Sequence, residues 1–332
     1  MDSLTSASGR EFRRAVVTGG AGFLGAHLCA ALLRDGAEVV CVDDFSTGSP
    51  EAVAPFRDEP GFELAVADVS DGLVVDGAVD LVLHFASAAS PPQYAARPVA
   101  TLRVGSAGTY NALRLAERCG ARFVMASTSE VYGDPLLHPQ REDYWGNVNP
   151  VGPRSVYDEA KRFSEALTTA FGQTGAVDTG IVRIFNTYGP GMRHDDGRAV
   201  PNFVRQALAG EPLTVAGNGR QTRSLCFVDD LVRGVLALAR SGLRTPVNIG
   251  NPHEVTVLEL AERIRSLAGS GSPVRFVDAA PDDPRRRCPD ITAAQRELGW
   301  SPETGLDEGL RRTIGWFASD EAAQRTSGEI RV

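Results

Sequence analysis

Residues 15–33 read AVVTGGAGFLGAHLCAALL, and this stretch decides the fold of the 332-residue chain. A short apolar run is followed by glycines with the spacing Gly-x-x-Gly-x-x-Gly, at Gly19, Gly22 and Gly25, and leucines then recur every fourth residue from Leu24. The pattern predicts a strand, a tight turn and an amphipathic helix. Because the turn lacks side chains, backbone amides and the helix N-terminus can approach a pyrophosphate there.

Similar apolar, β-branched runs recur along the first half of the chain and alternate with helical stretches. They cover residues 15–18, 38–42, 63–66, 80–85, 122–126 and 180–184. Strands that alternate with helices predict an α/β fold, a Rossmann-type doubly wound parallel sheet. After about Gly189 the pattern changes to Pro/Gly-rich loops, with helices expected near 200–209, 229–241 and 257–268. This half is expected to be a smaller C-terminal substrate-binding region.

Asp43 is predicted to end the second strand and to select the cofactor. It lies eighteen residues after Gly25. A carboxylate at this place accepts hydrogen bonds from the adenosine ribose and repels a 2′-phosphate, which favours NAD over NADP. Asp68, after the third strand, is read either as an adenine contact or as an ordinary loop aspartate. We therefore expect a disordered start at 1–10, an NAD-binding domain at 11–188, and a mainly substrate-binding region at 189–332 that is partly interleaved with it.

Composition narrows the possible partners and the compartment. The net charge of -8 argues against a nucleic-acid partner, which needs a positive field. The sequence has no long apolar run that would span a membrane and no secretory leader, so a cytoplasmic protein is expected. Its five cysteines form no Cys-x-x-Cys pair, and its five histidines show no paired ligand spacing. Neither a disulfide framework nor a metal site is expected.

Tyr157 and Lys161 are the candidate proton-transfer pair. They are four residues apart, so on a helix they share one face, where the ammonium lowers the pKa of the phenol. An isolated pair of this kind is more often a surface tyrosine beside a solvated lysine. Here the pair follows a strand that ends in Ser127 and Thr128, within a dinucleotide fold. We therefore predict that Thr128 and Tyr157 bind one substrate hydroxyl, whose proton passes to Tyr157 and whose carbon gives a hydride to NAD.

Five stretches carry a resemblance to a known family. They read ASTSEVYGDP (126–135), NVNPVGPRSVYDEAKR (147–162), RIFNTYGP (183–190), GEPLTVAGNGRQTRS (210–224) and DDPRRRCPDI (282–291). The chain resembles the extended short-chain dehydrogenase/reductase superfamily from about Arg14 to about Leu310, and within it the UDP-glucuronate decarboxylases. The resemblance implies a UDP-sugar substrate, an NAD that is reduced and reoxidised in each cycle, UDP-xylose as product, and a homodimer built through helices of the cofactor domain.

The resemblance also implies roles for individual residues. The catalytic positions are Thr128, Glu130, Tyr157, Lys161 and Arg287. The cofactor-binding positions are Gly19, Gly22, Phe23, Leu24, Gly25, Asp43, Asp44, Phe45, Thr47, Asp68, Val69, Ser87, Tyr157 and Lys161. The substrate-binding positions are Arg103, Asn111, Asn186, Arg198, Arg223 and Arg287.

Two of these roles have plainer alternatives. Glu130 is expected to orient the sugar or relay a proton, but a glutamate at a strand end can also simply face solvent. Arg287 matches the arginine that the family places near the substrate carboxylate, a task that suits a bidentate guanidinium. It stands in a basic run, Arg285 to Arg287, which is ordinarily a solvated surface patch.

Ser129 distinguishes the branches of the superfamily. The similar sugar-nucleotide 4,6-dehydratases carry an Asp-Glu pair where this chain has Ser129 and Glu130, because elimination of water from carbon 6 needs an added acid. A serine cannot supply that acid at neutral pH. Decarboxylation does not need it, because a carboxylate β to a new ketone at carbon 4 leaves as carbon dioxide. The sequence therefore favours decarboxylation.

Three positions depart from the family pattern. Ala88 replaces a usual proline, Gly105 a usual asparagine and Gly191 a usual arginine, with Arg193 nearby. Looser contacts at these positions would let the enzyme release UDP-4-keto-pentose. Two other interpretations remain: a nucleotide-sugar 4,6-dehydratase or 4-epimerase with the same core, and a non-catalytic NAD-binding scaffold, against which the intact core argues.

Overall fold

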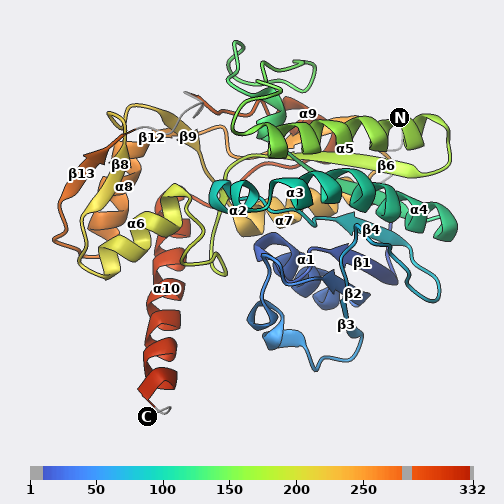
Figure 1. The fold of residues 1–332 in the computed structure, drawn as a ribbon, viewed down its shortest axis with the longest axis horizontal. Helices are drawn as coiled ribbons and strands as arrows, with labels where there is room; N and C mark the ends of the chain where they lie inside the picture. The colour runs from blue at the N-terminus through green and yellow to red at the C-terminus, as the bar shows by residue number, and fades with distance from the viewer. Residues whose placement is uncertain (1–9, 279–285, 330–332) are drawn as a thin grey trace, which may run out of the picture.

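A seven-stranded sheet forms the centre of the molecule in the computed structural model, which describes residues 10–278 and 286–329 (Figure 1). The strand order is β11-β6-β5-β4-β1-β2-β3, and every neighbouring pair is parallel. The strands are β1 (Arg14–Thr18), β2 (Glu38–Asp43), β3 (Phe62–Val66), β4 (Leu81–His84), β5 (Arg122–Thr128), β6 (Asp178–Ile184) and β11 (Pro246–Ile249). The predicted α/β fold is confirmed.

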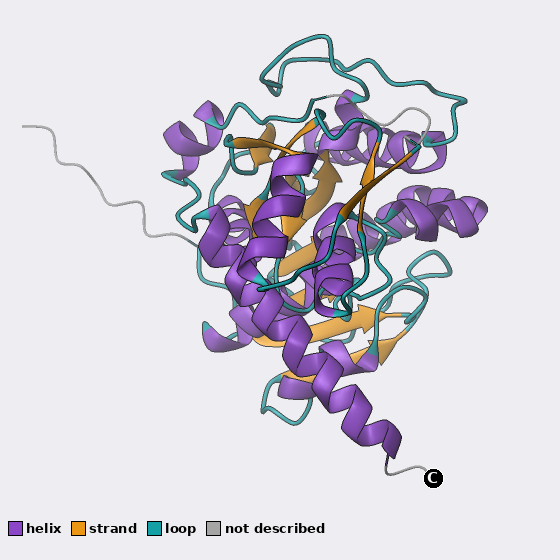
Figure 2. Ribbon diagram, turned by 90° about the vertical axis from the view of Figure 1, so that its left-hand side faces the viewer, coloured by secondary structure: helices purple, strands orange, loops and turns teal. Residues whose placement is uncertain are grey.

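Helices cover both faces of this sheet, as Figure 2 shows from the side. Helices α4 and α5 pack on β4, β5 and β6, while α1 and α7 pack against each other and on strands of the sheet. This double cover explains why every residue of β4 and β5 is buried. The helices around the sheet are α1 (Phe23–Arg34), α2 (Pro91–Ala96), α3 (Pro98–Arg103), α4 (Thr109–Cys119), α5 (Ser155–Gln173), α7 (Val228–Arg240) and α9 (Thr292–Leu298).

The sheet changes its direction of growth between β1 and β4. From β1 the chain adds β2 and β3 on one side, then crosses to add β4, β5 and β6 on the other. In doubly wound sheets, ligands bind in the crevice beyond the carboxyl ends of the strands at such a switch point. The fold therefore places its binding site beside the residues that follow β1 and β4.

The second half of the chain builds three small two-stranded sheets beside this crevice. They pair β10 with β7, β12 with β9, and β13 with β8. Their strands are β7 (Thr187–Tyr188), β8 (Leu213–Ala216), β9 (Thr222–Ser224), β10 (Cys226–Phe227), β12 (Glu254–Thr256) and β13 (Val274–Val277). The accompanying helices are α6 (Ala199–Leu208), α8 (Val257–Leu267) and α10 (Leu306–Glu329). In Figure 1 this region lies to the left of the large sheet.

The element limits agree closely with the predicted ones. The three helices expected in the second half begin at Ala199, Val228 and Val257, within one residue of the prediction. The fifth strand runs two residues further than expected, to Thr128. Residues 1–9 of the expected disordered start lie outside the described residues. Within the described part of the chain, none of the helices combines the length and hydrophobicity that a membrane crossing requires.

Candidate active site

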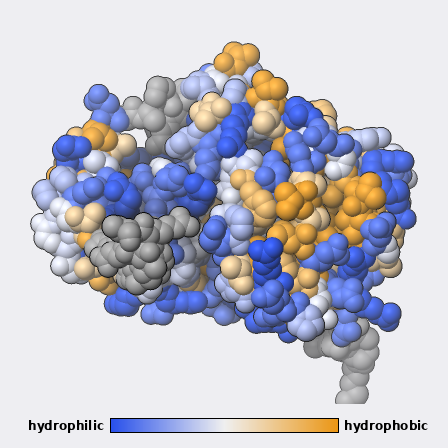
Figure 3. All heavy atoms as spheres, turned by 60° about the horizontal axis from the view of Figure 1, so that its bottom comes forward, coloured by the Kyte–Doolittle hydropathy of each residue, from blue (hydrophilic) through white to orange (hydrophobic). Residues whose placement is uncertain are grey.

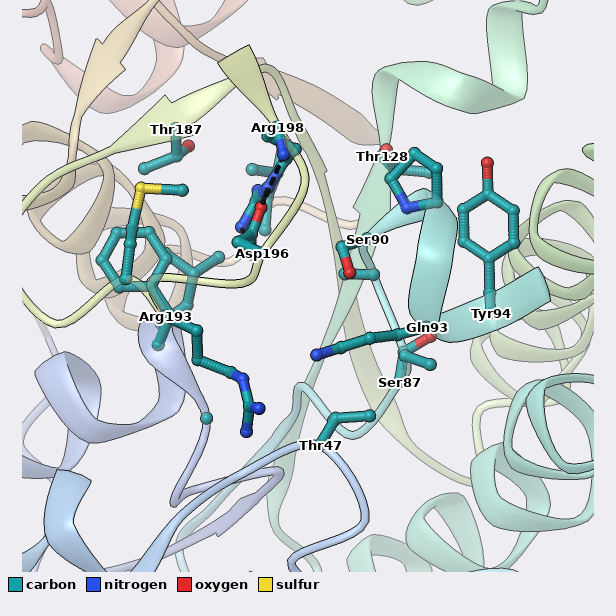
Figure 4. Close-up of a pocket in the computed structure, with 18 of the residues that line it drawn as sticks. Thr47, Ser87, Ser90, Gln93, Tyr94, Thr128, Thr187, Arg193, Asp196 and Arg198 are labelled. Carbon is teal, nitrogen blue, oxygen red and sulfur yellow. Dashed lines mark hydrogen bonds and ion pairs between the residues drawn. The ribbon is translucent and has the colours of Figure 1, made fainter. Parts of the chain in front are cut away.

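A cavity of about 800 Å³ opens at the switch point and is lined from both halves of the chain. The first half contributes the glycine-rich turn, the ends of β2, β4 and β5, and the start of α5. The second half contributes the loop after β6, the start of α6, and Arg223 and Arg287. Figure 4 shows Arg198, paired with Asp196, on one side of the space and Thr128 on the other. The volume is in the range of small-molecule sites.

The glycine-rich turn forms one wall of the cavity from main chain. Gly19 has a φ of +70°, and a Cβ on it would lie 2.7 Å from the backbone of Ala86. A Cβ on Gly25 would lie 2.0 Å from the carbonyl oxygen of Gly19. The glycines thus bring α1 directly against the turn, and no side chain caps its N-terminal Gly22. The helix start is therefore able to receive the negative charge of a pyrophosphate.

Asp43 ties the end of β2 to this turn. Its carboxylate accepts hydrogen bonds from the amides of Ala21, at 2.9 Å, and Phe45, at 2.8 Å. Burial raises the pKa of Asp43, while these two bonds act in the opposite sense. Each carboxylate oxygen keeps further acceptor capacity that a ribose hydroxyl can use.

Nearly all predicted cofactor positions line the cavity together. They are Gly19, Gly22, Phe23, Leu24, Gly25, Asp43, Asp44, Thr47, Asp68, Val69, Ser87, Tyr157 and Lys161. Phe45 is not among the lining residues; it has a φ of +57° and holds the turn that follows Asp43. Its predicted contact with the cofactor stays a prediction.

Tyr157 and Lys161 lie in the first two turns of α5, and both are buried. The side chain of Tyr157 lies beside that of Thr128, which ends β5 and favours the ionised phenol. The ring of Tyr94, from α2, stacks on that of Tyr157 with 5.2 Å between the centroids and 8° between the planes. The Nζ atom of Lys161 donates to the carbonyl of Ala126 at 2.8 Å and lies 5.8 Å from the centroid of the Tyr157 ring.

Burial is the largest influence on the pKa values of Tyr157 and Lys161. Burial raises the pKa of Tyr157, Glu130 adds to the effect, and the hydrogen bond from Thr128 and the charge of Arg198 oppose it. Burial also lowers the pKa of Lys161 to about 8. The lowering of the Tyr157 pKa by Lys161 stays a prediction. Ionisation of Tyr157 calls for a further positive charge beside it.

Glu130 lies between two arginines, Arg287 and Arg154, in the lining of the cavity. Both terminal nitrogens of Arg287 donate to its two carboxylate oxygens, and Arg154 donates to Oε2 at 2.6 Å. Burial works against the charged form, but the two guanidiniums outweigh it and hold the pKa of Glu130 below its ordinary value. One carboxylate between two guanidiniums leaves one positive charge without a counter-ion in this trio.

This arrangement excludes the alternative that Glu130 and Arg287 are solvated surface residues. Arg287 is buried and only 13% of the Glu130 side chain is exposed, so neither is a solvated surface group; Arg285 lies outside the described residues. Arg154 was missed from the sequence. Its position three residues before Tyr157, at the N-cap of α5, was visible in the sequence, but its contact with Glu130 was not.

The predicted substrate positions fall into two groups. Asn186, Arg198, Arg223 and Arg287 line the cavity. Arg103 and Asn111 do not line it. Arg103 is exposed and forms an ion pair with Asp71 at 2.7 Å, and Asn111 donates to the carbonyl of Val69 at 2.8 Å, which holds a cavity-lining loop in place.

Two of the three departures from the family pattern, Gly105 and Gly191, have local explanations. A Cβ on Gly105 would lie 2.7 Å from the Cβ of Ala160, so glycine lets the helical segment between α3 and α4 approach α5 near Tyr157. Gly191 has a φ of +85°, which favours glycine over arginine. Ala88 and Arg193 line the cavity, and Figure 4 shows Arg193 on the same side of it as Thr47.

Comparison with known proteins identifies the family. Residues 15–250 match the NAD dependent epimerase/dehydratase family. The chain belongs to this family. It is 49% identical to UDP-glucuronic acid decarboxylase 1 of Danio rerio over 94% of this chain and 74% of that protein, which confirms the predicted resemblance.

Solved structures of other family members are similar over nearly the whole length. The dTDP-glucose 4,6-dehydratase DesIV of Streptomyces venezuelae, solved with NAD bound, has a TM-score of 0.83 and 29% identity, covering 93% of this chain and 98% of its own. The UDP-glucuronic acid 4-epimerase of Bacillus cereus, solved with UDP-glucuronic acid and NAD, has a TM-score of 0.81 and 26% identity, covering 92% and 99%.

Proposed function

We propose that this family member decarboxylates UDP-glucuronate to UDP-xylose through a 4-keto intermediate. The observation that carries the proposal is the trio of Glu130, Arg154 and Arg287, whose extra positive charge faces the cavity that Tyr157 also lines. A buried guanidinium that is already positioned favours a ligand carboxylate. The 49% identity to a UDP-glucuronic acid decarboxylase supports the same substrate.

NAD fits the glycine-rich wall, because Gly19 and Gly25 leave no room for side chains and Asp43 offers a carboxylate at the ribose position. When bound, NAD supplies the acceptor for the carbon-4 hydride, a positive charge beside Tyr157, and the hydride for the final reduction. Residues of the turn and of the loops around Asp43, Asp68 and Ser87 would hold it.

Tyr157 is proposed as the base for oxidation of carbon 4. Its phenolate oxygen, on the side chain beside Thr128, would take the proton of the carbon-4 hydroxyl as that carbon gives up its hydride and becomes a ketone. Stacking on Tyr94 fixes the plane of the ring. Lys161, held by the Ala126 carbonyl, is proposed to keep a positive charge behind it. Once the ketone exists, the carboxylate on carbon 5 is β to it, and the bond to carbon dioxide breaks to leave an enolate.

The trio on the opposite wall is proposed to position the substrate carboxylate. Glu130 stays ionised between its two arginines, so orienting Arg287 and Arg154 suits it better than donating a proton. Ser129 is buried at the start of the turn that follows β5 and offers no acid for loss of water from carbon 6. A 4,6-dehydratase is therefore disfavoured. Arg223 and Asn186 are proposed to bind the diphosphate and the sugar.

We also propose a homodimer through α3, α4 and α5. Large hydrophobic side chains are exposed on these helices, at Val99, Leu102, Tyr110 and Phe163. Figure 3 shows hydrophobic side chains gathered on the half of the molecule that carries the large sheet. Contiguous exposed apolar surface of this kind marks protein interfaces.

Sedimentation at micromolar concentration tests the dimer. The double substitution Tyr110→Glu with Phe163→Glu should give a monomer. Trp145→Glu, at a loop tryptophan that is 89% exposed, should leave the dimer intact. A wild-type chain that sediments as a monomer contradicts the proposal.

Mass spectrometry of the products from UDP-glucuronate, with and without added NAD, tests the activity. We expect loss of carbon dioxide and formation of UDP-pentose, with any UDP-4-keto-pentose visible as a separate mass. Product of unchanged mass that chromatographs as the 4-epimer would contradict decarboxylation. Tyr157→Phe serves as the inactive control.

A further inference from the structure

Three metal-ligand side chains meet outside the active-site cavity. They are His138, Glu254 and Cys288, and their ligand atoms all lie within 4.8 Å of one another. The Nε2 atom of His138 is 3.0 Å from Oε2 of Glu254. The Cys288 thiol is free of any disulfide and donates to the carbonyl of Pro252 at 3.2 Å. None of the three residues lines the cavity described above.

Rigid parts of the fold carry these ligands. The backbone of Gln140, two residues after His138, bridges to the segment 288–290: its amide donates to the Cys288 carbonyl at 2.8 Å, and its carbonyl accepts from the amide of Asp290 at 2.8 Å. The side chain of Gln140 also accepts from the amide of Cys288 at 2.8 Å. Cys288 and the turn that carries His138 are thereby fixed to each other.

The third ligand is oriented by its own neighbour. Glu254 begins β12, which pairs with β9. The Thr222 hydroxyl of β9 donates to Oε1 of Glu254 at 2.6 Å, which turns the other oxygen, Oε2, toward His138. Hydrogen bonds of this kind to a ligating carboxylate are the usual outer support of metal sites.

We propose that His138, Glu254 and Cys288 form a binding site for a divalent transition-metal ion of the Zn²⁺ class. Imidazole, carboxylate and thiolate together are typical zinc ligands. With the usual bond lengths, a tetrahedral Zn²⁺ would hold the three ligand atoms roughly 3.3 to 3.6 Å apart. The 3.0 Å contact between His138 and Glu254 would open slightly, and any separation near the 4.8 Å limit of the cluster would shorten by about 1 Å. The side chain of His138 is 31% exposed, which gives the ion a path from solvent and a water as the fourth ligand.

Binding is a ligand exchange without redox chemistry. The Cys288 sulfur–hydrogen bond breaks, the proton passes to solvent, and the thiolate electron pair forms the bond to the metal. The hydrogen bond from the thiol to Pro252 is released. The hydrogen between Nε2 of His138 and Glu254 passes to solvent, the other ring nitrogen keeps or takes up a proton so that the imidazole is neutral, and the Nε2 lone pair binds the ion.

Because of its position, a metal ion at this site would affect the lining of the active-site cavity. Cys288 directly follows Arg287, which binds Glu130. An ion held by Cys288 would fasten the segment that carries Arg287 both to β12 and to the turn at His138. Metal binding should therefore raise the thermal stability of the chain, because a ligand that binds the folded state stabilises it by mass action.

No metal site was expected from the sequence, because these ligands are more than thirty residues apart and come from three separate segments. In the absence of a metal the same residues are an ion pair beside a buried thiol. The two interpretations differ in one measurable respect: an ion pair beside a thiol forms no metal–sulfur bond.

Co²⁺ is the first probe, because ligation by a thiolate gives a sulfur-to-metal charge-transfer absorption. The full chain, stripped with chelator and kept reduced with a phosphine, is titrated with Co²⁺ and then with Zn²⁺ in competition with a chromophoric chelator. We expect the charge-transfer band, saturation at one metal per chain, and displacement of Co²⁺ by Zn²⁺. A Co²⁺ titration of the wild-type chain without that band overturns the proposal.

Variants then assign the ligands. Cys288→Ser should abolish the band, and Cys288→Ser and His138→Ala should each weaken Zn²⁺ binding by at least about 100-fold, while Thr222→Val should weaken it by about tenfold. The controls are Cys119→Ser, at a partly exposed thiol, and His253→Ala, at an exposed histidine beside Glu254; both should bind as the wild type does. Equal Zn²⁺ affinity in the wild type and in folded Cys288→Ser overturns the proposal.

Discussion

The two walls of the cavity are built in different ways. The wall around Gly19 and Gly25 is made of main chain from one contiguous turn, and its shape depends on side chains that are missing. The wall around Glu130 is made of charged side chains, and its partners Arg154 and Arg287 lie 24 and 157 residues further along the chain. A local sequence pattern therefore predicts the first wall. The second wall forms only when the two halves of the chain have folded together.

The main-chain wall serves a feature that family members share, whereas the wall around Glu130 serves a feature in which they differ. A glycine-rich turn and an acidic residue after β2 serve any reaction that uses a dinucleotide, and the similar solved structures include both a dehydratase and an epimerase with NAD. A carboxylate clamped by two arginines suits a particular substrate. We therefore expect the glycine-rich turn and Tyr157 to determine whether oxidation occurs. The wall around Glu130, Arg154 and Arg287, here called the arginine wall, should determine which sugar is bound.

The largest effect should come from Tyr157→Phe. Removal of the hydroxyl removes the proposed base but keeps the ring that stacks on Tyr94, so the fold should be retained. We expect kcat for UDP-glucuronate turnover to fall by roughly 10³-fold, the usual contribution of a positioned general base. Tyr110→Phe, at an exposed tyrosine, is the control and should keep full activity. Equal activity of Tyr157→Phe and wild type, measured as carbon dioxide release, would exclude Tyr157 as the base.

Arg287→Ala should come next and should act through the substrate. It removes a bidentate partner from the buried Glu130 and one guanidinium from the wall, so kcat/KM for UDP-glucuronate should fall by about 10²-fold. Calorimetry gives the sharper comparison: UDP-glucuronate binding should weaken strongly, while binding of UDP-glucose, which lacks the carboxylate, should change little.

Arg205→Ala, at an exposed arginine paired with Glu211, controls for the loss of a surface charge. If Arg287→Ala weakens UDP-glucose and UDP-glucuronate binding equally, the arginine wall does not recognise the carboxylate. The two walls would then not divide their roles in the proposed way.

The same difference explains how much of the molecule the sequence could predict. Strand and helix limits were predictable within about two residues, because hydrophobic periodicity is local and the glycine spacing marks the first turn. Sequence alone does not reveal that Phe45 has a φ of +57° in the turn after Asp43, and its contact with the cofactor stays a prediction.

Long-range side-chain contacts were the part that sequence could not supply. Nothing in the neighbourhood of Arg154 shows that its guanidinium reaches Glu130, because that contact depends on the angle between α5 and the end of β5. Arg103 carries the charge of a ligand contact, yet it pairs with Asp71 on the surface. Charge and position in the chain indicate a class of role, and only packing decides which charges meet.

Gly25→Ala tests the main-chain wall. The added methyl would lie 2.0 Å from the Gly19 carbonyl oxygen, so α1 must move away from the turn. We expect a loss of about 1–3 kcal/mol of unfolding free energy, as for other overpacked sites, together with weaker NAD binding. Gly315→Ala is the matched control: this glycine is also helical, has open space around it, and should stabilise the chain by about 0.5–1 kcal/mol. Denaturant unfolding and NAD titration measure both; unchanged NAD affinity in Gly25→Ala would contradict a pyrophosphate at this turn.

Asp158 offers the most specific test of the electrostatics of the wall around Glu130, here called the charged wall. It is buried, its Oδ1 has no hydrogen-bond partner among the described residues, and burial together with the charge of Glu130 raises its pKa to about 7. An unfolded aspartate has a pKa of about 3.9, so between about pH 4 and 7 the folded chain binds a proton that the unfolded chain does not. Stability linked to Asp158 is therefore present at low pH and lost as the pH rises through about 7.

Asp158→Asn removes this dependence. One pH unit corresponds to about 1.4 kcal/mol, and the wild type loses this stability between pH 5 and the folded pKa of about 7. Relative to wild type, the variant should therefore gain about 2–3 kcal/mol of stability at pH 8 compared with pH 5, or roughly 4 °C in the midpoint of thermal unfolding. The difference between wild type and variant is the informative quantity, because every other titrating group contributes equally to both. Asp143→Asn, at an exposed aspartate paired with Arg141, should show a constant difference across the same range. A constant difference for Asp158→Asn as well would mean that the charged wall holds Asp158 ionised, and that the positive charge assigned to the trio is already neutralised.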